Sequence, residues 1–182
     1  HFTNGGLYLL GIDLRPARDE KEFVRILKEY IYKAPKGEWI TGGNWDHENW
    51  PSKKHPRREL IDAITPDHPV LVQRLDGHMA LANSLALKLA GVTRDTPDPQ
   101  GGEIVKDKKT GEPTGILRDT ATALVDAVIP PLSRQKRERA IRAAMRHAQE
   151  LGVTSVQDNS SREDLEIYQD LLRKGDDALC AD

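Results

Sequence analysis

The sequence predicts an α/β fold, because segments with helical periodicity alternate with short apolar segments along its 182 residues. A helix that Asp19 can cap is expected over 19–33, where apolar residues recur every three or four positions. A second helix, which Ser133 can cap, is expected over 133–151, followed by a buried strand at 153–157. The next helix is expected to be capped by Ser160 or Ser161 and to face inward with Leu165, Tyr168, Leu171 and Leu172. This order of helix, strand and helix is typical of a parallel sheet covered by helices.

The middle of the chain has a less regular pattern. Strands are expected at 38–43 and 69–75, and a helix at 85–90, which Asn83 can cap. Two apolar segments on either side of a Lys-Lys-Thr-Gly turn predict a hairpin over 103–117. We therefore expect a mixed α and β region between the two regular ends of the chain.

Composition narrows the classes of function. The chain holds 27 Lys and Arg against 29 Asp and Glu, so its net charge of −2 gives no general attraction to nucleic acids or acidic membranes. No apolar run approaches the ~20 residues of a membrane span. A single cysteine, Cys180, excludes an internal disulfide. We expect a globular, cytoplasmic protein, and a piece of a longer one, since both ends look cut.

Polar side chains follow three of the expected strands. Functional groups gather at the carboxyl ends of strands in parallel α/β folds, so these positions are candidates for a site, although each side chain can instead cap a helix or finish a turn. The candidates are Asp46 and His47 after the first strand, Asp76 and His78 after the second, and Gln157 and Asp158 after the third.

A carbohydrate-active site is one alternative. Asp46 and Glu48 supply two carboxylates, and Trp45 and Trp50, with Trp39, supply aromatic rings on which a sugar can stack. Tryptophan at this spacing is more often part of a local core. No two histidines show the close spacing of a metal-binding pair.

Several segments, in this order, resemble the amidohydrolase superfamily, and specifically its amidohydrolase family 3 branch. They cover nearly the whole chain, and together they are more specific than any one of them. The segments are 1–7 with 11–14, 38–46, 51–62, 67–70, 76–84, 96–104, 111–117 and 152–158.

This resemblance implies a fold and a division of the chain. The family fold is a (β/α)₈ barrel with a small β-sandwich, and an intact barrel needs ~250 residues. The chain would then be a partial TIM barrel with an α+β insert after the first barrel strand. Residues 1–33 would start the barrel, 34–131 would form the insert, and 132–182 would return to the barrel.

The resemblance also implies a chemistry, the metal-dependent hydrolysis of amide-type C–N bonds, other than peptide bonds, in small molecules. One or two divalent ions, usually zinc, are expected, with His1 as a metal ligand because it matches the second histidine of a His-x-His motif. His78 would contact the substrate or the oxyanion, with Asp76 orienting it. Substrate contacts would come from Trp45, Asp46, Gln157 and Asp158.

Two questions stay open at this point. A non-enzymatic binding module is the main alternative to the hydrolase, and the sequence leaves the oligomeric state undecided.

Overall fold

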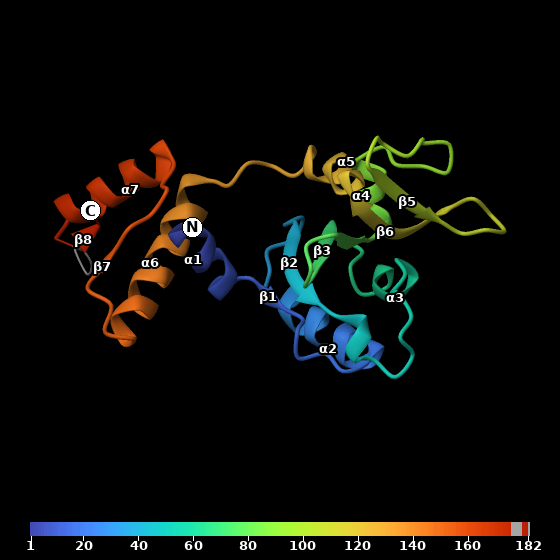
Figure 1. Cartoon of the computed structure of the whole chain (residues 1–182), viewed down its shortest axis with the longest axis horizontal. Helices are drawn as coiled ribbons and strands as arrows, with labels where there is room; N and C mark the ends of the chain where they lie inside the picture. The colour runs from blue at the N-terminus through green and yellow to red at the C-terminus, as the bar shows by residue number, and fades with distance from the viewer. Residues whose placement is uncertain (176–179, 182) are drawn as a thin grey trace. The chain divides into compact units, whose positions relative to one another are not determined.

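The computed structural model describes residues 1–175 and 180–181, and it divides into two compact units (Figure 1). The sheet unit is the continuous segment 12–129, and the helical unit combines residues 1–11 with residues from 130 onward. These boundaries differ from the expected ones because the helix expected over 19–33 packs in the sheet unit. Residues 176–179 and 182, within the expected segment 132–182, lie outside the described residues. Which segments belong to a barrel and which to an insert stays a prediction.

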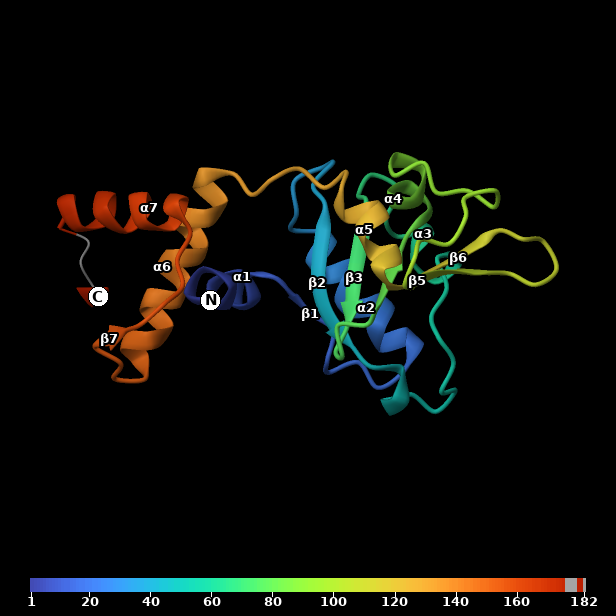
Figure 2. The same cartoon turned by 45° about the horizontal axis from the view of Figure 1, so that its top comes forward.

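The sheet unit is built on a six-stranded mixed sheet (Figure 2). The strands lie side by side in the order β1-β2-β3-β4-β6-β5. The first three pair in parallel and the remaining pairs are antiparallel. The strands are β1 (Ile12–Asp13), β2 (Ile40–Trp45), β3 (Val70–Arg74), β4 (Met79–Ala82), β5 (Gly102–Lys106) and β6 (Pro113–Asp119).

Helices cover both faces of this sheet, with α2 and α3 on one side and α4 and α5 on the other (Figure 1). The expected caps are confirmed, since the Asp19 carboxylate accepts a 2.7 Å hydrogen bond from the first turn of α2 and Asn83 caps α4. The elements are α2 (Glu20–Ile31), α3 (Glu59–Asp62), α4 (Ser84–Leu89) and α5 (Ala123–Asp126), with 3₁₀ turns at His47–Asn49 and Thr120–Thr122.

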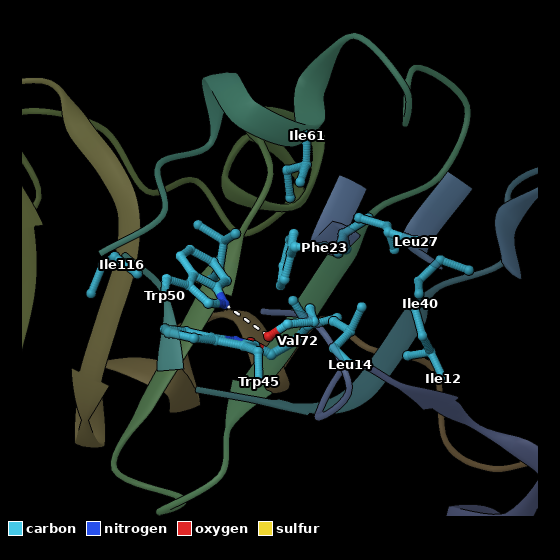
Figure 3. Close-up of a cluster of buried hydrophobic side chains, with 13 residues drawn as sticks. Ile12, Leu14, Phe23, Leu27, Ile40, Trp45, Trp50, Ile61, Val72 and Ile116 are labelled. Atoms are coloured by element: carbon cyan, nitrogen blue, oxygen red, sulfur yellow. Dashed lines mark hydrogen bonds between the residues drawn. The ribbon is translucent and has the colours of Figure 1, made fainter. Parts of the chain in front are cut away.

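The core beneath α2 contains the largest buried side chains of the sheet unit (Figure 3). Trp45 and Trp50 are fully buried there, and Phe23 of α2 meets Trp50 edge-on with ring centroids 5.5 Å apart. Each indole N–H has a partner: Trp45 donates to the Val72 carbonyl at 2.8 Å and Trp50 to the Ala17 carbonyl at 3.1 Å. The rings therefore add apolar burial without leaving a polar group unpaired.

At the end of the sheet opposite Trp45, the buried side-chain amide of Asn83 joins strand β3 to helix α4. The Asn83 Oδ1 accepts hydrogen bonds from the backbone N–H of Val70, on β3, and of Ala86, in α4. Its Nδ2 donates to Thr65 Oγ1 and to the His68 carbonyl, both at 2.8 Å. Asn83 is only 1% exposed, so water cannot take over these bonds.

We expect Asn83→Ala to lower the free energy of unfolding of the sheet unit by about 2–4 kcal/mol, because buried donors and acceptors lose their partner. All three tryptophans lie in this unit, so their fluorescence in urea measures its unfolding. Lys88→Ala, at an exposed position of α4, is the control. Equal stability of the two variants would contradict this role of the amide.

The helical unit packs α6 (Arg134–Glu150) against α1 (Phe2–Leu10) and α7 (Arg162–Arg173). The short strand β7 (Ser155–Val156) pairs in parallel with β8 (Cys180–Ala181). The expectation of a buried strand at 153–157 is wrong in two respects, because only two residues pair and Ser155 is exposed.

Helix α7 also corrects an expected burial pattern. Leu165 and Leu172, expected to face inward, are 51% and 63% exposed, whereas Ile167 and Leu171 are buried against α6. The buried pair is four residues apart and shares one face of the helix, while the exposed pair is seven apart and lies on another. The cap is Ser161, which forms a reciprocal capping box with Asp164.

Helix α1 was not expected from the sequence, since Gly5 and Gly6 are poor helix formers. Its packing explains Gly6. A Cβ added there would lie 1.8 Å from the backbone oxygen of Ala140 in α6, so only glycine permits this approach. A Cβ at Gly5 meets no described atom within 4 Å.

We expect Gly6→Ala to destabilise the helical unit by at least about 2 kcal/mol, because the added methyl must push α1 away from α6. Gly5→Ala is the matched control and is expected to gain up to about 1 kcal/mol from helix propensity. Urea unfolding followed by circular dichroism at 222 nm, with hydrogen exchange of the α6 amides, compares them. Equal stabilities would refute the close approach.

Candidate functional site

One edge of the sheet collects polar side chains from four strands. The parallel strands β2 and β3 end at this edge, the antiparallel strand β4 begins there and β6 ends there. We call this the carboxyl edge, and define it by Asp46, Arg74, Asp76, His78 and Asp119. The structure thus brings together two of the three expected polar clusters.

Arg74, the last residue of β3, links two of the candidate carboxylates. One guanidinium nitrogen lies 2.9 Å from Asp46 Oδ1 and another bonds Asp76. The Arg74 side chain is 18% exposed, and its Nε is buried with no partner among the described residues. Sequence reasoning missed Arg74. An arginine ending an otherwise apolar strand just before two acidic turns was the available signal.

Asp76 holds the main chain of the turn that leads into β4. Its Oδ1 accepts a 3.0 Å hydrogen bond from the backbone N–H of His78. Burial by itself raises the pKa of Asp76, but this hydrogen bond and the positive charge of Arg74 outweigh it and hold the pKa below its usual value. Asp76 therefore fixes the backbone position of His78, and its carboxylate does not contact the imidazole.

The imidazole of His78 is oriented by a residue that sequence reasoning missed, Asp119 at the end of β6. His78 Nδ1 lies 2.8 Å from Asp119 Oδ1. A carboxylate can only accept, so Nδ1 carries the proton and the other ring nitrogen, Nε2, points away from the pair. This hydrogen bond raises the pKa of His78. The side chain of His78 is 78% exposed and so open to a ligand.

The backbone at Asp119 is strained. Its φ of 47° and ψ of −123° fall in a region that glycine adopts readily and other residues avoid. Such a conformation costs of the order of 1–3 kcal/mol, and the surrounding structure must hold it in place. The N–H of Asp119 donates to the His78 carbonyl at 3.0 Å, which is one part of that restraint.

Two further histidines meet edge-to-face near this edge. The rings of His47 and His55 have centroids 4.5 Å apart, and the Nδ1 of His47 is buried without a partner among the described residues. Burial lowers the pKa of both, and the charge of Arg74 lowers that of His47 further. Glu48 works in the opposite direction, with an oxygen 3.4 Å from His47 Nε2. The net shift of both pKa values is downward, which favours the neutral form of the two rings.

This pair predicts a loss of stability on acidification. The folded pKa values lie below the unfolded value of about 6.5, so the unfolded chain gains protons first as the pH falls through that value. We expect the urea midpoint of tryptophan fluorescence to fall between pH 7.5 and pH 5. The raised pKa of His78 opposes this change and makes it smaller.

Replacing both histidines, as in His47→Phe with His55→Phe, is expected to flatten the decline because these rings cannot bind a proton. His147→Gln, at an exposed position of α6, is the control and should leave the decline unchanged. A double variant with the same pH dependence as the original chain would contradict the assignment.

The third expected cluster lies in the helical unit. The Asp158 Oδ1 lies 2.8 Å from the backbone nitrogen of His1 and accepts a 3.1 Å hydrogen bond from the backbone N–H of Phe2. Ser160 donates to the other carboxylate oxygen. The backbone at His1 is thus fixed beside the end of β7, while its side chain is 85% exposed. Gln157 is exposed next to this carboxylate.

Two of the three tryptophans cannot form a stacking platform. Trp45 and Trp50 are 0% and 1% exposed, so neither presents a ring face to a ligand, whereas Trp39 is partly exposed. This burial argues against the carbohydrate alternative, and the contact of Trp45 with substrate stays a prediction that it does not support. Asp46 keeps some exposure, but its carboxylate is engaged by Arg74 and by the 3₁₀ turn that follows it.

The expected metal requires several donor side chains to lie close together. Within the part of the chain that the structure describes, no three His, Cys, Asp or Glu side chains are grouped to hold an ion. These residues do not fit a complete metal site, and His1 would supply a single imidazole.

In the same described part, no helix has both the length and the apolar character needed to cross a bilayer.

Comparison with solved structures gives the class of protein first. The whole chain superposes on part of a crystal structure of an uncharacterized metal-dependent hydrolase from Pyrococcus horikoshii, with a TM-score of 0.72 and 28% identity. The chain covers 34% of that protein. Its mixed α/β fold is therefore found within a metal-dependent hydrolase.

Sequence comparison gives the family. The amidohydrolase family matches residues 1–177, and the chain belongs to this family. Protein LONG AFTER FAR-RED 3 of Arabidopsis thaliana is 42% identical over 87% of the chain, and N-substituted formamide deformylase of Arthrobacter pascens is 33% identical over 57%. The chain spans 27% and 19% of these two proteins.

Proposed function

We propose that this chain is a segment of a longer hydrolase that cleaves amide-type C–N bonds, other than peptide bonds, in small molecules. Membership of the amidohydrolase family supports the bond type, and the similarity to a formamide deformylase supports a small amide as substrate. The observation that carries the proposal is the fixed position of His1 beside Asp158 at the end of β7, since metal-dependent hydrolases bind ions at strand ends.

In this proposal His1 binds a divalent metal, zinc, together with ligands from outside this chain. When bound, such an ion supplies an activated water at neutral pH. Each unit is assigned its own contacts. In the helical unit, Asp158 fixes the backbone of His1 and Gln157 contacts the substrate. In the sheet unit, Asp46 is a substrate contact, and the protonated imidazole of His78 is a hydrogen-bond donor to a substrate carbonyl.

The test uses the protein that contains this chain. We expect it to hydrolyse an N-substituted formamide or a related small amide, to lose activity when a chelator removes its metal, and to regain activity with zinc. His1→Ala is expected to lower metal content, measured by mass spectrometry, by about tenfold or more, because even indirect contacts to a metal matter that much.

The control is His147→Ala, which removes an exposed helical histidine and should change neither metal content nor activity. Unchanged metal content in His1→Ala would refute the ligand role. A metal-loaded protein that hydrolyses no amide would refute the proposed reaction and favour the non-enzymatic binding module.

A further inference from the structure

Asp119 combines two features that stability alone does not explain. Its backbone conformation is one that glycine adopts at lower energy. Its carboxylate makes one described contact outside its own turn, with the imidazole of His78. Both side chains are more than half exposed, and exposed ion pairs add little to stability. A stable fold by itself would therefore favour glycine at this position.

The strands place these two residues directly opposite each other. Met79 of β4 pairs with Arg118 of β6, so the next pair along the antiparallel ladder is His78 with Asp119. The Asp119 N–H bonds the His78 carbonyl, which continues the ladder by one step. Asp119 adopts its unusual backbone conformation at this last pair of the ladder, where its carboxylate contacts the His78 imidazole.

The hydrogen bond to Asp119 selects which nitrogen of the His78 imidazole carries the proton. With Nδ1–H held on the carboxylate, a neutral ring presents Nε2 as a proton acceptor and a charged ring presents it as a donor. Asp76 fixes the His78 backbone from the other side of the turn. The ring is therefore held at both ends of its side chain while Nε2 faces away from the pair.

We propose that Asp119 is a positioning residue that holds His78 in the Nδ1–H tautomer and presents its Nε2 to the substrate. The identity of that substrate, a small amide, rests on the proposed function, whereas the state of the imidazole does not. In catalysis the neutral ring takes up a proton from water at Nε2, and the imidazolium so formed gives that proton to the departing amine, while Asp119 keeps its carboxylate on Nδ1 throughout.

The test compares Asp119→Asn and Asp119→Gly in the protein that contains this chain. Nitrogen chemical shifts of ¹⁵N-labelled histidine report the tautomer and the pKa of His78, with His78→Gln identifying its signals. In both variants we expect the pKa to fall toward that of a free histidine and the Nδ1–H form to lose its predominance. Asp119→Gly should nevertheless be at least as stable in urea as the original protein, because it relieves the strained backbone.

Activity provides a second readout. Both Asp119 variants are expected to lower kcat/KM at least tenfold, mainly through kcat. The pH profile of kcat/KM should shift to lower pH, as the pKa of His78 does. Asp119→Glu should recover part of the activity. Glu103→Gln is the matched control, since Glu103 is an exposed carboxylate on the adjacent strand β5 and pairs with Arg118 rather than with His78.

The outcomes separate this inference from the proposed function. An unchanged tautomer and pKa of His78 in both variants would overturn the positioning role. Variants that are less stable but have kcat/KM within threefold of the original would also overturn it, because Asp119 would then act in folding alone. If the protein hydrolyses no amide, the proposed function fails, and the tautomer and pKa still decide the role of Asp119.

Discussion

The register of the antiparallel half of the sheet depends on the buried amide of Asn83. Its side chain and backbone both bond Val70, which locks the end of β4 against the start of β3. A slip of one residue would turn every side chain of β4 to the opposite face and leave this amide unpaired. The separate ladder between β4 and β6 then places His78 opposite Asp119.

Most helices were predictable because local chemistry defines their ends. Asp19, Asn83 and Ser133 cap the helices for which the sequence predicts them, since each side chain accepts a bond from its own first turn. Strand β4 was missed because its residues, Met-Ala-Leu-Ala, favour a helix. Only pairing with β3 and β6 makes this segment a strand, and that pairing joins distant parts of the chain.

The same strand explains which parts of the site the sequence revealed. Asp46, Asp76 and His78 were found because each follows a recognisable strand or turn. Asp119 was missed because its place beside His78 depends on β4, and Arg74 was missed because its partners come from two different loops. Trp45 lies beyond the strand expected at 38–43, but it ends β2 and is buried.

The division of the chain has a consequence for its biosynthesis. Residues 12–129 form one continuous segment whose contacts are complete once that segment has left the ribosome. Helix α1 emerges earlier, yet its partner α6 begins only at Arg134. The apolar side of α1 must therefore wait, uncovered, while more than a hundred residues are translated, which makes it a natural target for a chaperone that shields nascent chains.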